Sequence, residues 1–170
     1  NITISNSGTI SGPEEQINLS TQDGECMMMP GGCAATTGVV ITNSGTIDST
    51  GNIGGSNGAI KIAGATITSI TNTGNINGTG NSIYIRDSGS GTDGTIATLT
   101  NTGTMEGTIK ADNDGFVTTL INDQGKENSN PLAWDTNIPT NTQIKINSVS
   151  DFGQLAVSNV NGTTTFSIAT

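Results

Sequence analysis

A short motif recurs along the chain, and this repetition constrains the fold more than any other feature. Four copies align without gaps, at Ile4–Ile10, Ile41–Ile47, Ile70–Ile76 and Leu99–Met105. A weaker fifth copy, Leu120–Gly125, carries one extra residue. The exact spacing of 29 residues between copies occurs twice in succession. Self-similarity at a period of this size is the signature of a repeat architecture, in which each unit stacks on its neighbours.

Each repeat contains three strand-like pieces and no segment with the 3.6-residue spacing of an amphipathic helix. Apolar triplets recur inside the units, and further β-branched pieces precede the next motif. These segments are Ile17–Leu19, Ile60–Ile62, Ile83–Ile85 and Thr108–Lys110, and then Val39-Val40, Ala65–Ser69, Thr95–Thr98 and Phe116–Thr119. Stacked units bury apolar faces that single units cannot. We therefore predict an all-β right-handed parallel β-helix, with about five rungs over residues 1–125.

The composition agrees with strands joined by many corners. Hydrophobic residues make up 31% of the chain and aromatic residues 3%, so a core built around large rings is not expected. Isoleucine dominates the small apolar set, and Gly, Asn, Ser and Thr dominate the remainder. Branched side chains pack well on a pleated surface, and the polar residues favour turns.

The asparagine of each motif is expected to point inward, because alternate strand residues share a face. The residues at this position are Asn6, Asn43, Asn72, Asn101 and Asn122. Stacked amides can form hydrogen bonds along a column, which would make these residues a structural ladder. A ring of ligand-binding amides is the alternative. Gly45, Gly74 and Gly103 follow the ladder and are expected to supply the positive φ that a corner often needs.

Two cysteines interrupt the regular spacing. Cys26 and Cys33 lie within an insertion at about residues 20–38, where the interval between motifs is longer than 29 residues. Zinc would need further Cys or His ligands, and the redox motif has a closer spacing. We therefore expect a disulfide that closes a small loop. The loop contains Met27, Met28 and Met29, which are a candidate binding surface because methionine adapts to varied partners; folding back over the column is the alternative.

Residues 126–170 break the repeat. Period-2 strands at 142–149 and 154–160 precede Asn161-Gly162 and a last strand at 163–168. Asn-Gly between strands is a strong hairpin signal. Because the apolar end of a solenoid needs a cap, we expect this segment to form one with an antiparallel hairpin. Trp134 is expected to pack beneath that cap and not to serve as a sugar platform.

Charge and residue content exclude several classes of function. The net charge of −9 and the scarcity of basic residues argue against nucleic acid and against an anionic membrane surface. No apolar run reaches 18 residues, so no membrane insertion by this segment is expected. Without histidine a nucleophilic triad is impossible. We expect no catalytic residues, cofactor or metal. We interpret Asp112-Asn113-Asp114-Gly115 as a solvated turn, and a set of calcium ligands is the alternative.

Pairs of threonines separated by one residue occur at Thr66/Thr68, Thr71/Thr73, Thr98/Thr100/Thr102 and Thr163/Thr165. They resemble the pairs of ice-binding β-helices. Their spacing along the chain, however, predicts no single flat face of equal rungs.

The repeated Ile-Thr-Asn-Ser-Gly-Thr-Ile motif with Gly- and Asn-rich turns resembles the passenger domains of bacterial autotransporters, from residue 4 to about 125. The isoleucine- and asparagine-rich character of the repeats is also similar to that of vacuolating-toxin-like passengers. The resemblance implies secretion through the outer membrane and display on the bacterial surface, here as a fragment without its membrane barrel. The function we expect is non-enzymatic adhesion to a host-cell protein or glycan, or self-association between bacterial cells. A receptor-binding toxin segment and a carbohydrate-active enzyme are the alternatives.

Overall fold

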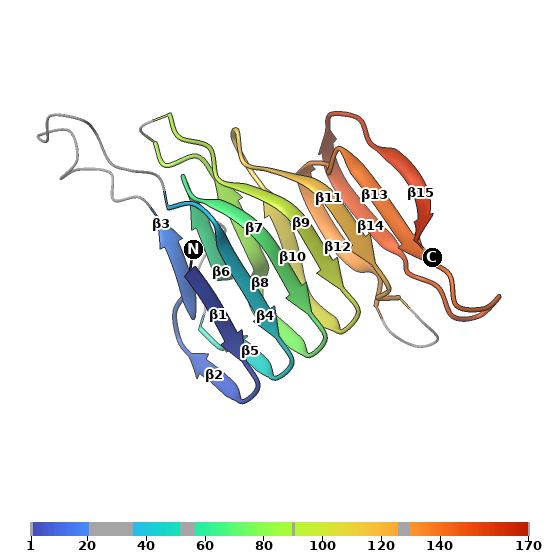
Figure 1. Cartoon of the computed structure of the whole chain (residues 1–170), viewed down its shortest axis with the longest axis horizontal. Helices are drawn as coiled ribbons and strands as arrows, with labels where there is room; N and C mark the ends of the chain where they lie inside the picture. Colours follow the sequence, from blue (N-terminus) through green and yellow to red (C-terminus); the bar gives the residue numbers. More distant parts are fainter. Residues whose placement is uncertain (1, 21–35, 52–56, 90, 126–129, 170) are drawn as a thin grey trace, which may run out of the picture.

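The chain forms two parallel β-sheets (Figure 1). The computed structural model describes residues 2–20, 36–51, 57–89, 91–125 and 130–169, and these contain no helix. The first sheet contains β1 (Ile2–Asn6), β4 (Val39–Asn43), β7 (Thr66–Asn72), β9 (Thr95–Asn101), β11 (Phe116–Asn122), β13 (Asn141–Lys145) and β15 (Thr165–Ala169), in that order. The second sheet contains β2 (Thr9–Gly12), β5 (Thr46–Ser49), β8 (Asn75–Arg86), β10 (Thr104–Ala111), β12 (Leu132–Asn137) and β14 (Leu155–Asn161), with β3 (Ile17–Ser20) and β6 (Gly58–Ala63) alongside.

Most strands that follow one another along the chain lie in different sheets, except that β3 follows β2 and β6 follows β5 within the second sheet. Each strand pairs with the equivalent strand of a neighbouring repeat. β1 pairs with β4 and β2 with β5, for example, and all these pairings are parallel. One passage through the first sheet and then the second is called a coil below. The prediction of an all-β chain built from parallel strands is confirmed, and the architecture is β-helix-like.

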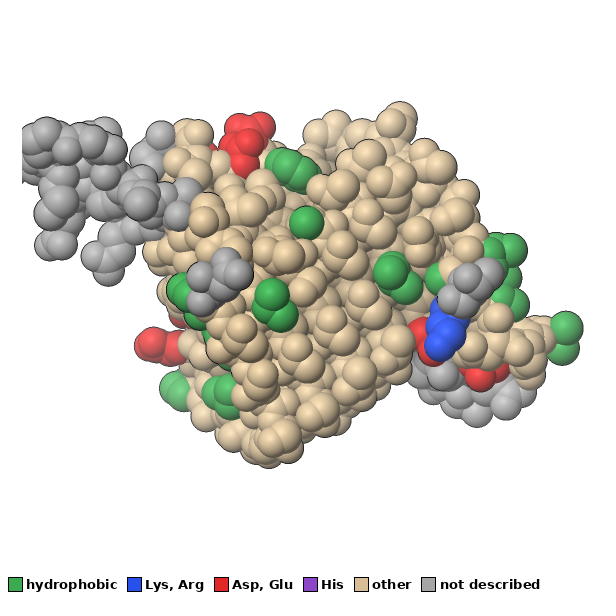
Figure 2. Space-filling view, in the orientation of Figure 1, with side chains coloured by type: hydrophobic (Ala, Val, Ile, Leu, Met, Phe, Trp, Pro, Cys, Tyr) green, Lys and Arg blue, Asp and Glu red, His purple; other side chains and the backbone are tan. Residues whose placement is uncertain are grey.

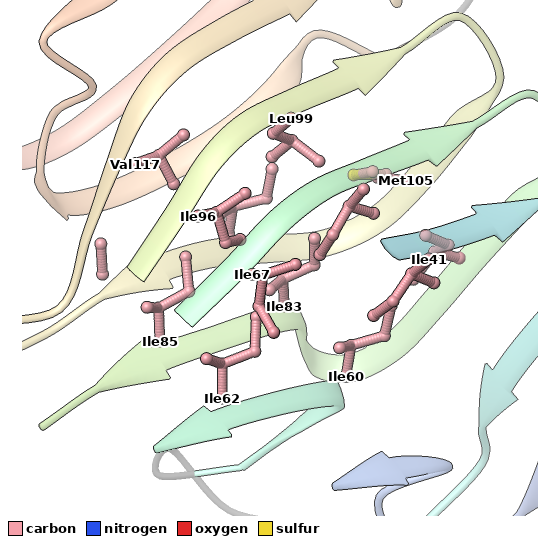
Figure 3. Packing of buried hydrophobic residues seen from close by; sticks show 14 of the residues in the cluster. Ile41, Ile60, Ile62, Ile67, Ile83, Ile85, Ile96, Leu99, Met105 and Val117 are labelled. Carbon is pink, nitrogen blue, oxygen red and sulfur yellow. The ribbon is translucent and has the colours of Figure 1, made fainter. Parts of the chain in front are cut away.

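The hydrophobic core lies between the two sheets (Figure 3). Equivalent motif positions form columns that cross the strands: Ile41 pairs with Ile70 and Ile70 with Leu99 in the first sheet. In the second sheet Ile47 pairs with Ile76. All five side chains are fully buried. Burial of such a side chain contributes about 1.5–3 kcal/mol, so the column of apolar residues holds successive coils together.

The motif glycines are needed for a different reason from the one predicted. Gly45, Gly74 and Gly103 are not among the glycines with positive φ. A Cβ added at Gly74 would instead lie 2.1 Å from the carbonyl oxygen of Gly45, and one at Gly45 would lie 2.0 Å from that of Gly8. The corners of neighbouring coils therefore approach too closely for any side chain.

The carboxyl-terminal residues continue the two sheets and do not form a separate cap. β12 and β14 extend the second sheet, whereas β13 and β15 extend the first, all through parallel pairing. The predicted antiparallel hairpin is therefore wrong. Asn161-Gly162 turns the chain from the second sheet to the first, and Asn161 Nδ2 donates to Asn137 Oδ1 of the preceding coil at 2.9 Å. The one antiparallel contact described here is an isolated bridge between Ile146 and Phe152.

The last coil leaves inward-facing apolar side chains exposed. Trp134 is buried in the core, although it lies within the second sheet and not beneath a separate cap, and its Nε1 donates to the carbonyl oxygen of Asn137 at 2.9 Å. Val157 pairs with Trp134 and continues its column, yet 47% of Val157 is exposed. Phe166 and Ile168 on β15 are also mainly exposed. The described residues therefore end in an open apolar face.

Candidate functional site

Hydrogen bonds between the motif asparagines form the predicted ladder. Asn6 Nδ2 donates to Asn43 Oδ1 at 2.8 Å, and Asn43 Nδ2 donates to Asn72 Oδ1 at the same distance. Asn72 Nδ2 donates to Asn101 Oδ1 at 2.9 Å. Asn101 Nδ2 lies 3.4 Å from Asn122 Oδ1, which closes the series. These side chains are fully buried except Asn6, which is 9% exposed.

The ladder has a structural role, because its donors are already engaged. Asn43 Nδ2 also lies 3.2 Å from the carbonyl oxygen of Gly45 and 3.0 Å from that of Asn75 in the next coil. The same pattern recurs at Asn72 with Gly74 and Thr104. A buried amide with partners on every side offers nothing to a ligand, so the alternative of ligand-binding amides is not supported.

Gln124 completes the ladder and was not foreseen from the sequence. Its Oε1 accepts from Asn101 Nδ2 at 2.9 Å and from the backbone N–H of Met105 at 2.7 Å, while its Nε2 donates to the Met105 carbonyl at 3.0 Å. The side-chain amide thus pairs with Met105 as a strand backbone would. The extra residue of the fifth motif copy is the one signal that pointed to this place.

The cysteine loop falls outside the described residues. Cys26, Cys33, Met27, Met28 and Met29 all belong to the segment 21–35. The predicted disulfide and the candidate binding surface therefore stay predictions.

The outer face of the first sheet carries two in-register columns of mainly polar residues, interrupted by Val40 and Ile121. The strand register aligns Thr3, Val40, Ser69, Thr98, Thr119, Asn141 and Thr165 in one column, and Ser5, Thr42, Thr71, Thr100, Ile121, Gln143 and Ser167 in the other. We call these two columns the hydroxyl face. Most positions carry Thr or Ser, and none carries a charge. Figure 2 shows this side of the molecule with charged side chains toward its margins and separate hydrophobic side chains among the polar ones.

Of the threonine pairs in the sequence, only Thr98 and Thr100 both lie in the two columns, so the expectation that the pairs do not share one face holds. The unequal repeat lengths are absorbed in the loops and in the second sheet, so Thr71 and Thr100 remain direct neighbours. In the pair Thr71/Thr73, Thr73 lies beyond the end of β7, and the partner of Thr71 on the face is Ser69. Register between strands, and not spacing along the chain, decides which residues share a face.

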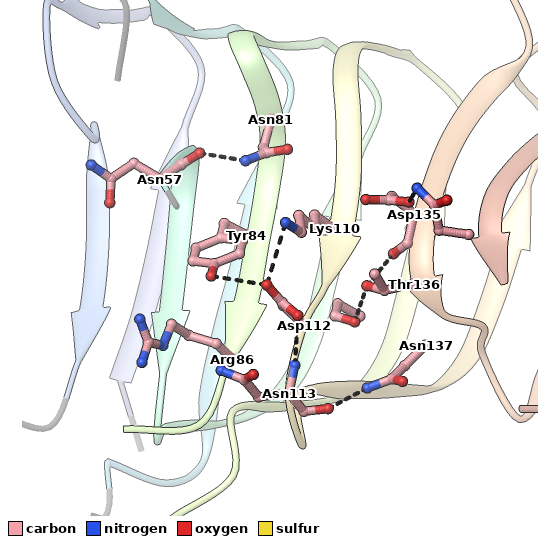
Figure 4. A network of polar contacts seen from close by, with 12 residues as sticks. Asn57, Asn81, Tyr84, Arg86, Lys110, Asp112, Asn113, Asp135, Thr136 and Asn137 are labelled. Atoms are coloured by element: carbon pink, nitrogen blue, oxygen red, sulfur yellow. Dashed lines mark hydrogen bonds and ion pairs between the residues drawn. The ribbon is translucent and has the colours of Figure 1, made fainter. Parts of the chain in front are cut away.

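The outer face of the second sheet is charged. The register aligns Lys61, Tyr84, Lys110 and Asp135 across β6, β8, β10 and β12 (Figure 4). We call this row, together with Arg86 and Asp112 beside it, the charged face. Of the four basic side chains that the structure describes, only Lys145 lies elsewhere. The two outer faces thus differ sharply in charge.

The lysines of this face are paired with acidic neighbours. Lys61 Nζ lies 3.5 Å from Glu15 Oε1, and Lys110 Nζ lies 3.3 Å from Asp112 Oδ2. The Lys110 ammonium also lies 5.9 Å from the centre of the Tyr84 ring, which is nearly buried beneath its neighbours. The row therefore brings two ammonium groups and the Tyr84 side chain together, with Asp135 beside Lys110.

Asp112 is the group whose titration this arrangement changes. Partial burial raises the pKa of its carboxyl. The backbone N–H of Asn113 and the Lys110 ammonium, with a contribution from the Tyr84 hydroxyl, outweigh that effect, so the pKa lies below its ordinary value of 3.8. The carboxylate is therefore charged at neutral pH and is engaged by protein groups.

Metal binding and membrane crossing find no support in the described part of the chain. No cluster of three or more Asp, Glu, Cys or His side chains there is suited to a metal ion. The residues at 112–115 form a turn in which Asp112 Oδ1 accepts from the N–H of Asn113 at 2.9 Å. No helix among these residues is long and apolar enough to cross a membrane.

No known family model, curated protein or solved structure matches this chain. The functional argument therefore depends on the geometry of the two faces.

Proposed function

We propose that the chain is a non-enzymatic binding domain of the autotransporter-passenger type, displayed on a bacterial surface, and that the charged face makes the contact with a host-cell protein or glycan. The observation that carries the proposal is the gathering of Lys61, Tyr84 and Lys110 in one row of a rigid sheet. The Lys61 and Lys110 side chains are 23% and 25% exposed, so their ammonium groups can reach a partner, while Tyr84 lies buried between them.

The finer architecture belongs to the same proposal. Five strands of the first sheet come from residues 1–125, which fits the five predicted rungs, and β13 and β15 add two more coils. Right-handed coiling follows the strong preference of parallel crossover connections. An experimental structure in which the coil is left-handed would contradict this part.

Binding of the purified chain to cultured epithelial cells tests the contact. The double variant Lys61→Ala/Lys110→Ala removes both ammonium groups that flank Tyr84, and we expect it to lose most of the binding. Lys145→Ala is the matched control, because it removes one charge from the end of β13 on the other sheet. Circular dichroism should show the same β content for all three proteins.

The outcome identifies the class of partner. Binding that disappears when the cells are treated with protease indicates a protein receptor, and binding that disappears with glycosidases indicates a glycan. Clumping of bacteria that display the chain, without host-cell binding, indicates self-association. Equal binding by the wild type and the double variant would exclude the charged face.

A further inference from the structure

Three Asn-Gly pairs occur in the sequence, at Asn57-Gly58, Asn77-Gly78 and Asn161-Gly162. Asparagine is among the thermolabile residues of proteins. It is most reactive before glycine, because the backbone nitrogen of the next residue can attack the side-chain amide carbon when no Cβ hinders the approach. The attack requires the backbone to rotate, so the fold decides which pair can react.

Two of the pairs lie inside the second sheet and are held in place. Gly78 is in register with Ser49, and a Cβ at Gly78 would lie 1.8 Å from the carbonyl oxygen of Asn81. Gly58 is in register with Asn81, and a Cβ there would lie 2.8 Å from the backbone nitrogen of Tyr84. Both glycines are buried, so the paired strands resist the rotation and keep water and base away.

The third pair lies in an open turn. Residues 161–163 are exposed and connect β14 with β15. A Cβ at Gly162 would have no neighbour closer than Ile138 Cγ2, at 3.8 Å, and the N–H of Gly162 has no hydrogen-bond partner among the described residues. Gly162 also has a φ of +96°, which glycine adopts without strain. The nitrogen that must attack is therefore accessible to base and lies next to open space.

The side chain of Asn161 ends a series of polar contacts between coils. Its Nδ2 donates to Asn137 Oδ1 at 2.9 Å. Asn137 Nδ2 in turn donates to the carbonyl oxygens of Asn113, at 2.6 Å, and of Gly115, at 3.0 Å (Figure 4). Asn137 cannot turn its amide round without losing both of these contacts. A group at position 161 that only accepts hydrogen bonds would therefore face another acceptor.

From these contacts we propose that Asn161 is a site of spontaneous deamidation and that the change loosens the last coil. The nitrogen of Gly162 forms a bond to Cγ of Asn161, and its proton passes through water to the side-chain nitrogen, which leaves as ammonia. Water then opens the succinimide ring at either carbonyl carbon and gives aspartate or isoaspartate. Aspartate places a carboxylate against Asn137 Oδ1 with no hydrogen to share, and isoaspartate lengthens the main chain by one carbon.

Mass spectrometry of the folded chain, aged at mildly alkaline pH in water enriched in oxygen-18, tests the site. Trypsin cuts after the basic residues between the pairs and so releases each pair in a separate peptide, in which fragmentation locates the change. We expect Asn161 to exchange its side-chain nitrogen for heavy oxygen severalfold faster than Asn57 and Asn77. In guanidinium chloride the three rates should become similar. Asn161 that stays intact in the folded chain, or equal rates at the three pairs there, would overturn the proposal.

Two variants test the effect on the last coil. Asn161→Asp supplies the carboxylate without ageing, and we expect the backbone amides of β14 and β15 to exchange hydrogen severalfold faster than in the wild type. Ser150→Asp is the matched control, because it adds the same charge at an exposed position between β13 and β14 and should leave the exchange unchanged. Wild-type exchange rates in Asn161→Asp would contradict the loosening. Neither measurement depends on binding to host cells.

Discussion

At the residue scale, each buried asparagine of the ladder serves two neighbours at once. Asn72 accepts from Asn43 and donates to Asn101, so its removal takes one acceptor from Asn43 Nδ2 and the amide donor from the buried Asn101 Oδ1. A buried polar group without a partner costs about 1–3 kcal/mol.

We therefore expect Asn72→Ala to lower the free energy of unfolding by about 1–3 kcal/mol. Thr71→Ala, one residue away on the outer face, should cost a few tenths. Chemical denaturation of both variants measures the difference. Equal losses would mean that the amide hydrogen bonds add nothing beyond ordinary packing.

The interactions of Asp112 lead to a prediction about stability at low pH. Its pKa is lowered in the folded chain, so its interactions stabilise the fold above the ordinary pKa of 3.8 and are lost as the pH falls through the lower, folded value. The free energy of unfolding of the wild type should therefore decrease as the pH is lowered from about 4 to about 2. Asp112→Asn should lose less stability over this range, and denaturation curves at the two pH values check it. An identical pH dependence in the two proteins would remove Asp112 as a contributor.

The sequence was informative about residues wherever alternation alone decides the direction of a side chain. The ladder asparagines were predicted from period-2 alternation, and the structure places them inward. Gln124 was missed because its role depends on the backbone groups of Met105 that it faces, and Met105 lies 19 residues away along the chain. No local pattern contains that information.

At the scale of the strand and its corner, neighbouring coils meet most closely at the motif glycines. Gly74 faces the carbonyl of Gly45, but a Cβ at Gly8, the equivalent residue of the first coil, would meet nothing within 4 Å. The motif therefore offers a pair of equivalent positions, Gly8 and Gly74, with different surroundings.

We expect Gly74→Ala to cost about 1–3 kcal/mol through overpacking, whereas Gly8→Ala should stay within about 0.5 kcal/mol of the wild type. Thermal melting followed by circular dichroism compares the two. If Gly8→Ala is as damaging as Gly74→Ala, backbone conformation and not close approach is the reason for glycine.

The elements themselves were predicted well, and their partners less well. Apolar triplets located β6 and β8 correctly, because a strand needs little more than β-branched residues between turns. Asn161-Gly162 was misassigned because a tight corner is required equally by a hairpin and by a chain that crosses to another sheet. The parallel pairing of Thr142 with Phe166 is decided by how the sheets pack around the core, and not by the residues next to them in the chain.

At the scale of the whole molecule, the two sheets end in edges that pair with nothing among the described residues. On β15, 62% of Phe166 and 65% of Ile168 are exposed, although both continue inward columns of the preceding coils. Exposed strand edges with apolar side chains are templates for association.

We expect the purified chain to associate as its concentration rises, and Phe166→Asp/Ile168→Asp to suppress this. Analytical ultracentrifugation over a range of concentrations measures the effect. Ile2→Asp at the other end of the first sheet provides a comparison, since Ile2 is 48% exposed. Association that none of these substitutions changes would place the contact on the sides of the column.

The ladder also gives the molecule a direction. Every amide from Asn6 to Asn101 donates toward the carboxyl-terminal end, so the amide dipoles point the same way and add along the axis. By the same geometry the Oδ1 of Asn6 faces the amino-terminal end, whereas Asn122 Nδ2 finishes on the backbone carbonyl of Gln154 and the column continues through Ile144. A strand that stacks on the amino-terminal end would fit best with an amide donor at the ladder position. A strand that stacks on the other end would fit best with an apolar side chain there. The two ends are therefore chemically distinct, and growth of such a column by stacking would be polar, with each end selecting a different kind of neighbour.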